Sequence, residues 1–311
     1  MCIRDRTLAH LVRPWFILIL GFLLGMAQAF DAPARQALVA ELVPLEDLTN
    51  AIALNSTMVN IAFFLGPAFS GIIYTYLGPA FCFLINGISY LAVIVALFLM
   101  KLSPLKKIES SNSAIDDLKQ GIKYLKSQPL ILALIATVGL LSLFGSGSLT
   151  LLPAWAVRIL HGDARTNGWL QSARGLGALV AALFIASLGR FSFRGRLLTI
   201  GAFSLPLLML IFSFSSHLGL SLITLFTVGI AIIIVANLAN SLVQSLVDYS
   251  MRGRIMGLYS LSFFGFMPLG SLLTGQIASA LGERQTILIN SCFLFLFLTI
   301  VWLLAPKIKK L

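Results

Sequence analysis

Long apolar segments alternate with short polar ones along almost the whole chain. Apolar runs occupy, among others, residues 14–30, 80–100, 129–152 and 286–305. About 20 residues of α-helix cross a hydrocarbon core of roughly 30 Å, so each of these runs is long enough to span a membrane. Membrane β-barrels show short alternating segments instead. The pattern therefore predicts an all-α polytopic membrane protein.

Nine spans follow from the positions at which polar residues interrupt these runs. We place them at about 14–34, 48–77, 80–101, 129–152, 167–189, 197–214, 219–246, 254–281 and 285–305. The polar, lysine-rich segment 102–127 separates the third span from the fourth. Within it Ile115, Leu118, Ile122 and Leu125 recur at helical spacing, which predicts an amphipathic helix on the membrane surface. The predicted domains are a three-span unit at 1–101, this linker at 102–127, and a six-span unit at 128–311.

Two of the apolar runs carry the same glycine pattern. The segments "LGPAFSGIIYTYLG" (65–78) and "LGSLLTGQIASALG" (269–282) match at an offset of 204 residues, pairing Gly66 with Gly270, Gly71 with Gly275, and Gly78 with Gly282. The match extends over roughly 32–90 against 236–294. Both copies cross the membrane in the same direction, which indicates a parallel repeat. Spans four to six have no partner copy, so we expect about 80 further residues with three helices to precede Met1.

The distribution of charge predicts the orientation in the membrane. Only 11% of residues are charged and the net charge is +11, whereas about a quarter of residues are charged in soluble domains. Lysine and arginine gather in the linker and near residues 190–196, 252–254 and 307–310. By the positive-inside rule these segments and the C-terminus face the cytoplasm. The basic balance thus reflects topology and not a nucleic-acid partner, although Arg4, Arg6 and Arg13 break the rule at the other end.

Motifs for catalysis and for metal or cofactor binding are missing from the sequence. The three cysteines form no CxxC pair, and the three histidines are scattered. GxxxxGK[ST], HExxH and GxSxG do not occur. We therefore expect no enzyme activity, no metal and no cofactor. Transport by such a chain would draw on an ion gradient or on the substrate's own gradient.

Several segments together resemble the major facilitator superfamily of secondary transporters. They are the parallel repeat around a basic central loop, "DYSMRGRIMG" at 248–257, and "SLGRFSFRGRLL" at 187–198, which lacks the family's usual acidic residue. The segment "AFDAPARQALVAELVPLEDLTNAIALNS" at 29–56 resembles the branch of the enterobactin exporter and related efflux permeases. The resemblance implies a bundle of twelve helices, of which the nine spans would be helices four to twelve. It also implies a bacterial inner-membrane protein that exports a siderophore or drug-like molecule by alternating access, coupled to protons.

The resemblance assigns a role to the Gly-Pro sequence in the second span. The family's antiporter motif is a spaced set of small residues that ends in Gly-Pro and a further small pair. Small residues allow helices to pack backbone to backbone in lipid, and proline bends a helix. Ordinary packing in a helical bundle is the alternative. The residues that fit are Ala62, Gly66, Pro67 and Gly71, with Gly270 and Gly275 in the second copy.

Charged residues near the predicted cytoplasmic helix ends are candidates for a gate. Asp31 and Arg35 are four residues apart, and so are Asp248 and Arg252, with Arg254 following. Such spacing stabilises a helix by a few tenths of a kcal/mol. Salt bridges that break during transport are one interpretation; charge that only sets the topology is the other. We expect the nine spans to contain no strongly buried carboxylate for proton coupling.

Arg174 is the most informative single residue, because it lies about eight positions into the fifth span and roughly 12 Å deep. A charge at that depth is costly unless it faces a cavity or a partner. With Gln171 it could line a central cavity and hold an anionic group of the substrate, or it could extend to the outer headgroups. By resemblance, further amides mark cavity-lining faces, although each is also explained by an interhelical hydrogen bond of about 0.6 kcal/mol: Gln28, Asn55, Asn60, Asn237 and Asn240.

The sequence therefore predicts a secondary transporter whose partners are a small-molecule substrate, a proton or other coupling ion, and the lipid bilayer. Two alternatives stay open. One is a membrane subunit or receptor with nine native spans that transports nothing, and the other is an uptake permease. Substrate, coupling stoichiometry and oligomeric state are not encoded in any motif that we identify.

Overall fold

The computed structural model describes residues 19, 20, 23, 27, 48–100, 114–188, 193–248 and 251–310. The chain divides into two compact units, residues 1–107 and 108–311. The boundary between them falls inside the predicted linker. Apart from residues 19, 20, 23 and 27, the predicted first span lies outside the described residues. The same is true of Gln28, Asp31 and Arg35, and of the side chains of Asn55 and Asn60.

The first unit contains two described apolar helices that follow each other directly. Helix α3 is Leu48–Leu77 and helix α4 is Pro79–Leu99. Pro67 lies inside α3, and the hydroxyl of Ser70 donates a hydrogen bond to its carbonyl at 3.0 Å. Pro79 occupies the first turn of α4, where its missing N–H costs nothing. Both helices begin and end within about three residues of the predicted spans.

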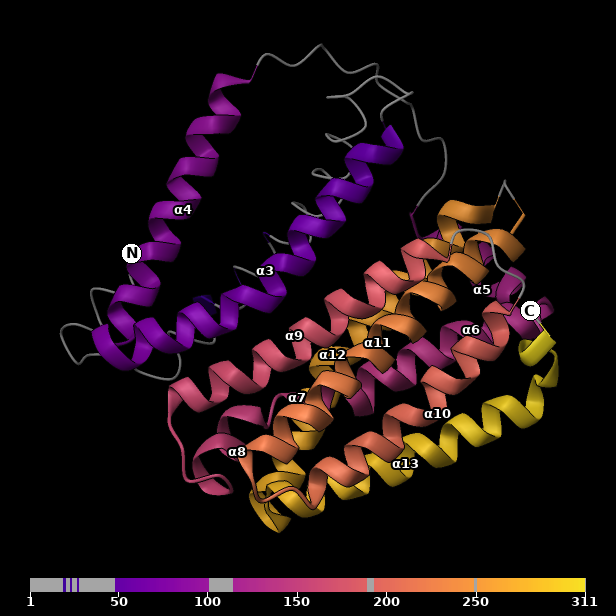
Figure 1. Ribbon diagram of the computed structural model, residues 1–311. Coiled ribbons are helices and arrows are strands. Elements are labelled where there is room, and N and C mark those ends of the chain that lie inside the picture. The colour runs from indigo at the N-terminus through magenta and orange to yellow at the C-terminus, as the bar shows by residue number, and fades with distance from the viewer. Residues whose placement is uncertain are drawn as a thin grey trace. The chain divides into compact units, whose positions relative to one another are not determined.

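The second unit is a bundle of helices (Figure 1). Its elements are α5 (Ala114–Ser127), α6 (Pro129–Leu140), the π-helix η1 (Leu141–Ser146), α7 (Gly147–Leu149), α8 (Leu152–Arg158), α9 (Ala164–Ser187), α10 (Arg194–Ser213), α11 (Leu218–Leu246), α12 (Arg252–Leu281), α13 (Glu283–Leu304) and the 3₁₀-helix η3 (Pro306–Lys310). Seven segments of the described chain, including Pro79–Leu99, are long and apolar enough to cross a membrane.

One predicted span differs from the structure in length and regularity. The fourth runs from Pro129 to Arg158 instead of ending at 152, and it contains η1 in its middle. Two polar contacts accompany this π-helical stretch: Ser142 donates to the carbonyl of Phe263 in α12, and Ser148 donates to Phe144 at 2.7 Å. π-helical turns have no signature in hydrophobic periodicity, so the sequence pattern predicted a plain helix.

The repeat seen in the sequence also exists in the backbone. Gly78 ends α3 with φ 81° and ψ 172°, and Gly282 ends α12 with φ 85° and ψ 166°. In each case the glycine amide donates to the carbonyl four residues earlier, at 3.0 Å and 2.9 Å. Residues with a side chain rarely adopt this positive φ. The two copies therefore use glycine for the same turn between two helices.

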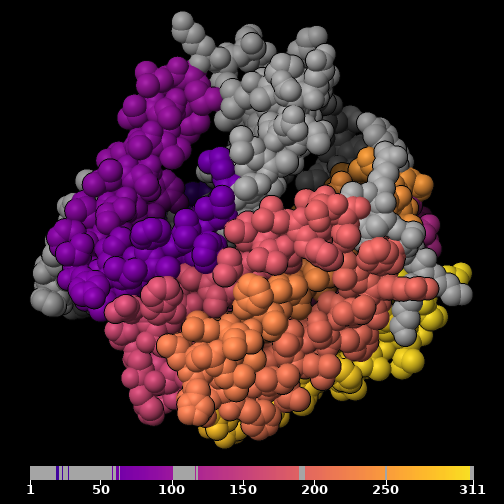
Figure 2. Space-filling view, viewed as in Figure 1, coloured from indigo at the N-terminus to yellow at the C-terminus, as the bar shows by residue number. Residues whose placement is uncertain are grey.

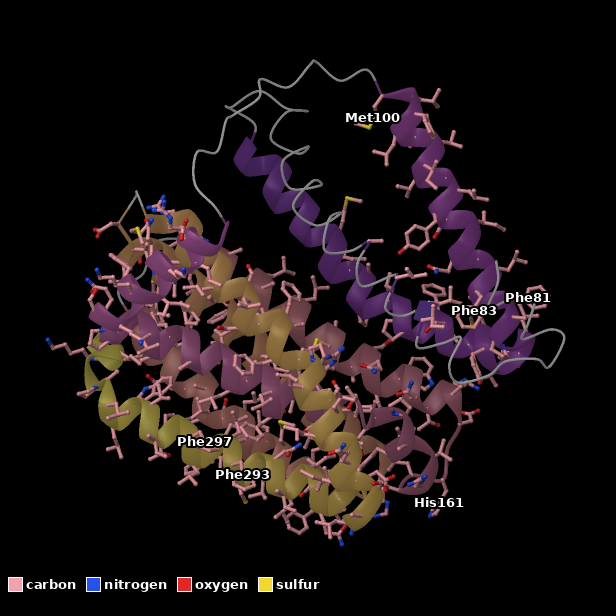
Figure 3. All side chains as sticks on the ribbon, turned by 180° about the vertical axis from the view of Figure 1, so that it is seen from behind. Phe81, Phe83, Met100, His161, Phe293 and Phe297 are labelled. Atoms are coloured by element: carbon pink, nitrogen blue, oxygen red, sulfur yellow. The ribbon has the colours of Figure 1, made fainter. Side chains whose placement is uncertain are left out.

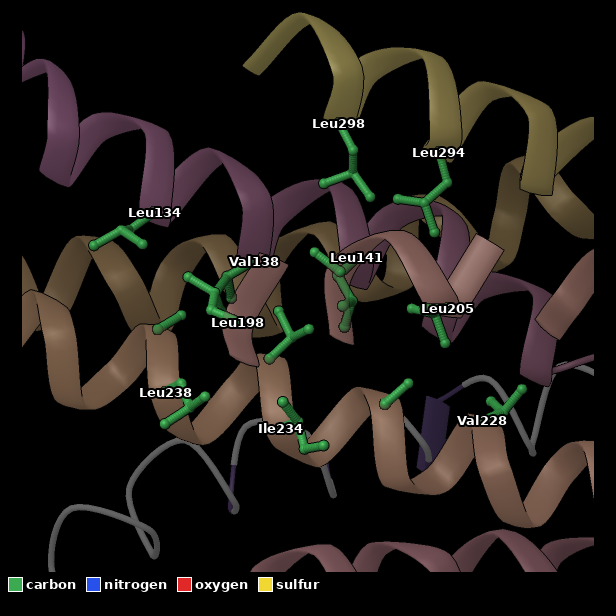
Figure 4. Close-up of a cluster of buried hydrophobic side chains, with 14 of the residues drawn as sticks. Leu134, Val138, Leu141, Leu198, Leu205, Val228, Ile234, Leu238, Leu294 and Leu298 are labelled. Carbon is green, nitrogen blue, oxygen red and sulfur yellow. The ribbon is translucent and has the colours of Figure 1, made fainter. Parts of the chain in front are cut away.

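Apolar side chains from α6, η1, α10, α11 and α13 form the core of the second unit (Figure 4). Leu134, Leu198, Leu205 and Leu294 are almost completely buried. In the space-filling view, side chains of this unit fill the spaces that the ribbon leaves open (Figure 2). Lipid is as apolar as leucine, so close packing and polar contacts hold such a bundle together.

An aromatic group joins η1 to α13. The rings of Phe144 and Phe297 stack with their centroids 5.8 Å apart, and Phe293 stacks on both at 6.0 Å and 6.2 Å. Figure 3 shows Phe293 and Phe297 on successive turns of α13. Stacked pairs add about 0.5–1.5 kcal/mol beyond the area that they bury. These aromatic contacts therefore hold the π-helical part of the fourth span against α13.

The linker helix α5 packs against the bundle as well as forming an amphipathic surface. Leu125 is buried, whereas Leu118 and Ile122 are exposed. A Cβ added at Gly121 would lie 3.1 Å from Leu258 of α12, so the two helices are in close contact there. The helix at the predicted position is present, and α12 forms part of its docking surface.

Candidate functional site

Arg174 lies near the middle of α9. Helix α9 begins at Ala164, three residues before the predicted start, so Arg174 is about ten residues, or roughly 15 Å, from that end. About 13 residues, or roughly 20 Å, separate it from Ser187 at the other end. The structure therefore places Arg174 about two residues further from the start of its helix than the sequence predicted.

Two glycines set the position of the Arg174 backbone by allowing α9 and α11 to touch. A Cβ added at Gly229 of α11 would lie 2.0 Å from the Arg174 carbonyl oxygen, and one added at Gly177 would lie 1.9 Å from the carbonyl oxygen of Phe226. Only glycine permits such an approach at either point. The two helices lie side by side there (Figure 1), so the backbone that carries Arg174 is fixed.

The Arg174 side chain has no hydrogen-bonding partner among the described residues. Its Nε atom is buried and makes no hydrogen bond there, and no salt bridge to it occurs in that part of the chain. Gln171, one turn earlier, is half-buried on the same face. Asn167 lies one turn further along this face, half-buried, and its Oδ1 is also buried without a partner in the described structure.

The amides of α11 form a separate polar group. Gln244 donates to Asn240 Oδ1 at 2.5 Å, and Asn237 is exposed one turn away. Asn237 lies eight residues, or about 12 Å, along α11 from Gly229, which marks the level of Arg174. The structure thus brings Asn237, Asn240 and Gln244 together, but it does not bring them to Arg174.

Asp248 follows the end of α11 and contacts the linker helix. Its Oδ2 accepts a hydrogen bond from the hydroxyl of Tyr124 in α5 at 3.0 Å. Arg252 and Arg254 are the first and third residues of α12, and Nη1 of Arg254 contacts the Met251 sulfur at 3.4 Å. The proposed gate residues of this half therefore lie around the α11–α12 connection, and Tyr124 joins them.

The small residues of the repeat differ in their surroundings. A Cβ added at Gly270 would lie 2.0 Å from the Leu143 carbonyl oxygen, so α12 touches η1 at this point. Added at Gly66 or Gly275, a Cβ would meet no described atom within 4 Å. Gly71 is buried, Pro67 is half-buried and Ala62 is exposed in the described first unit. Equal positions in the repeat thus have unequal packing in the structure.

Three polar contacts, made by Asn290 and Glu283, were not predicted from the sequence. Asn290 of α13 is buried and donates to Ser148 and to Thr274, each at 2.9 Å. Glu283, which lies two residues before the predicted ninth span, is buried at the start of α13 and forms a 2.7 Å salt bridge with Arg158. We expected no strongly buried carboxylate in the spans, but the last helix begins two residues before the predicted start at 285 and therefore includes Glu283. The recurrence of "LIN" at 84–86 and 288–290 was the available signal for Asn290.

Comparison with known proteins agrees with this architecture. The chain is 23% identical to the multidrug efflux pump Tap of Mycolicibacterium fortuitum, covering 95% of this chain and 74% of that one. It is 24% identical to the staphyloferrin A transporter of Staphylococcus aureus (94% and 73%) and 21% identical to macrolide efflux protein A of Streptococcus pyogenes (96% and 74%). A bacterial homologue of the lysosomal transporter Spinster, solved in an inward-facing unoccupied conformation, matches with a TM-score of 0.65 at 13% identity, over 89% of this chain and 74% of that one.

The family match covers nearly the whole chain. The model of the family described as transmembrane secretion effector matches residues 1–310. The structural likeness shows the fold, and the family model and the named relatives show a transporter and not an enzyme. The chain belongs to the transmembrane secretion effector family of major facilitator superfamily transporters.

Proposed function

We propose that the chain exports a small organic molecule across the bacterial inner membrane by alternating access, with the C-terminus in the cytoplasm. The observation that carries this proposal is the match of a secretion effector family model over residues 1–310. Relatives named as a multidrug efflux pump and a macrolide efflux protein support the outward direction. The family match also favours transport over a subunit or receptor that moves no substrate.

The energy source in this proposal is the proton gradient. A proton-coupled carrier needs a group that binds and releases a proton in a protected place. Glu283 is a buried carboxylate among the described residues, and it forms a salt bridge with Arg158 at the start of α13. We assign it a structural role and leave the proton-binding group of the proposal unassigned within the described helices.

The gate in this proposal lies at the α11–α12 connection. Asp248, Arg252 and Arg254 occupy the helix ends that we predict to be cytoplasmic, and Asp31 with Arg35 would be the counterpart in the first half. Gly270 supports a role in helix packing through its contact with η1. Polar contacts that differ between two conformations are a common way for transporters to hold each state.

Transport in membrane vesicles tests the proposal. Inside-out vesicles containing the 311-residue chain should accumulate at least one compound of a radiolabelled panel (a macrolide, a dye and an organic acid) when a pH gradient, acidic inside, is imposed, and a protonophore should abolish the accumulation. Vesicles from cells with an empty vector are the control. Accumulation only in right-side-out vesicles would instead identify an uptake permease. Folded protein that moves no compound of a macrolide, dye and organic-acid panel in either orientation would contradict the proposal.

An uptake permease is the second candidate function. The similarity to a protein named staphyloferrin A transporter, a name that states no direction, is compatible with this candidate. The two vesicle orientations separate the candidates, since export and uptake fill opposite preparations.

A further inference from the structure

Arg174, whose Nε atom is buried, has no counter-ion among the described residues of the second unit. Residues 129–304 contain three carboxylates: Asp163 and Asp248 lie outside the spans, and Glu283 is the first residue of the last one. Asp163 caps α9, Asp248 accepts from Tyr124, and Glu283 is paired with Arg158. An ionised group inside a membrane protein is expensive unless it is paired and hydrogen-bonded. Arg174 therefore holds a positive charge that these helices do not neutralise.

The polar face of α9 extends beyond this one residue. Asn167, Gln171 and Arg174 follow each other at spacings of four and three, so they form one stripe about 10 Å long. Two atoms of opposite kind on this stripe, the donor Nε of Arg174 and the acceptor Oδ1 of Asn167, are buried without partners in the described chain. Side chains on a helix lean toward its N-terminus, which directs Arg174 toward the turn of Gln171.

The backbone under the stripe is rigid, as a recognition site requires. Gly229 of α11 lies against the Arg174 carbonyl, and Gly177 lies against Phe226. A guanidinium presents its donors in a planar fork that fits the two oxygens of a carboxylate or phosphate. Because the fork is carried on a fixed backbone, little conformational freedom is lost when an oxyanion binds.

We infer that Arg174 recognises an oxyanion group of the transported molecule, so that the substrates are organic anions, with Gln171 and Asn167 binding polar atoms next to that group. This inference rests on the proposed function, because it places the site in a transport pathway. It narrows the substrate class to compounds that carry a carboxylate or phosphate. A neighbouring hydroxyl or amine on the substrate would serve as the donor that the Asn167 oxygen lacks.

Equilibrium binding to the purified 311-residue chain tests the inference directly. The probes are radiolabelled salicylate and salicylamide, which share a ring and a hydroxyl and differ in the charge of one group, measured by scintillation proximity in detergent. We expect the wild type to bind salicylate at least tenfold more tightly than salicylamide. Arg174→Gln should remove this preference, and Arg174→Lys should keep part of it. Arg165→Gln is the matched control, because it removes one positive charge from the exposed first turn of the same helix.

Three results of this binding experiment would overturn the inference. Equal affinity of the wild type for both probes, or an unchanged preference in a folded Arg174→Gln protein, overturns the inference. Loss of the preference in Arg165→Gln as well would also overturn it, since surface charge would then explain the effect. If Arg174→Gln does not fold, three other measurements still test the inference: the preference of the wild type, the preference of Arg174→Lys, and the affinity of Asn167→Ala. We expect Asn167→Ala to lose affinity for salicylate by about threefold or more.

Failure of the inference is distinguishable from failure of the proposed function. Gradient-driven movement of a macrolide in vesicles, together with no binding preference for salicylate, would leave export standing and reject the anion site. A salicylate preference that depends on Arg174, together with no movement of any probe in vesicles, would support the anion site and reject transport by this chain.

Discussion

The hydroxyl of Tyr124 bridges the carboxylate and the backbone of Asp248. It donates to Oδ2 at 3.0 Å and accepts from the Asp248 amide at 3.3 Å. The two residues are 124 positions apart in the sequence. Through this contact the linker helix α5 is joined to the connection between α11 and α12, which is the connection that we propose as a gate. The linker is therefore positioned to respond when this connection moves.

Removing the Tyr124 hydroxyl should loosen α5. The Tyr124→Phe variant keeps the ring but loses both hydrogen bonds, at an expected cost of about 1 kcal/mol. That cost corresponds to roughly fivefold faster opening. Hydrogen–deuterium exchange of residues 114–127 in the detergent-solubilised chain should show this increase, while exchange in α10 stays unchanged. Identical exchange of α5 in both proteins would show that the contact does not hold the helix.

The Asp248→Asn variant separates the two roles of this residue. Asparagine can still accept from Tyr124, so α5 should stay docked and its exchange should stay close to that of the wild type. If the charge of Asp248 contributes to a gate, transport should fall in Asp248→Asn but not in Tyr124→Phe. The reverse result would assign the function of this contact to linker docking.

Gly270 and Gly275 should respond differently to the same substitution. Gly270→Ala would place a methyl group 2.0 Å from the Leu143 carbonyl, so α12 and η1 must separate, at an expected cost of about 1–3 kcal/mol. Gly275→Ala meets open space and should be neutral or stabilising by up to about 1 kcal/mol, since alanine favours helix. Thermal unfolding in detergent measures both. Equal effects would contradict the packing described for these two positions.

Gly270 and Gly275 differ in a way that the sequence could not predict. Apolar runs and glycine turns predicted the spans, and the repeat predicted that Gly78 and Gly282 occupy equivalent positions. The repeat predicted the same packing role for Gly270 and Gly275. The spacing in the sequence shows which residues are small, but it does not show which of them another backbone contacts. Tyr124 was not singled out for the same reason, since its partner comes from a distant part of the chain. Arg174 could be identified because a charge in an apolar run is visible without tertiary contacts.

Asn290 should stabilise the second unit more than its counterpart in the repeat stabilises the first. Asn290→Ala removes hydrogen bonds to Ser148 and Thr274, worth together roughly 1 kcal/mol in a membrane bundle. Asn86, the equivalent residue 204 positions earlier, has an exposed side chain in the described structure. Asn86→Ala should therefore shift the unfolding midpoint in detergent less than Asn290→Ala does. A larger shift for Asn86→Ala would contradict the stabilising role that we assign to the Asn290 hydrogen bonds.

Asp163 should make the start of α9 sensitive to acid. Hydrogen bonds hold the pKa of this carboxylate below its usual value near 3.8, chiefly the bond from the Thr166 backbone amide and then that from the Thr166 hydroxyl. A carboxylate whose pKa is lower in the folded state stabilises the fold at pH values above the unfolded pKa. That stabilisation is lost as the pH falls through the folded pKa, which lies below 3.8. The unfolding midpoint of the wild type should therefore decline in this range.

Two variants isolate the contribution of the Asp163 charge from that of the cap. Asparagine also caps helices well, so Asp163→Asn should lower the unfolding midpoint slightly at pH 6 and should not add to the decline below pH 4. The gap between wild type and Asp163→Asn should close as the pH falls. Asp163→Ala loses the cap at every pH and should stay below both proteins near neutrality. A gap between wild type and Asp163→Asn that is constant from pH 6 to pH 3 would show that the Asp163 charge does not stabilise α9.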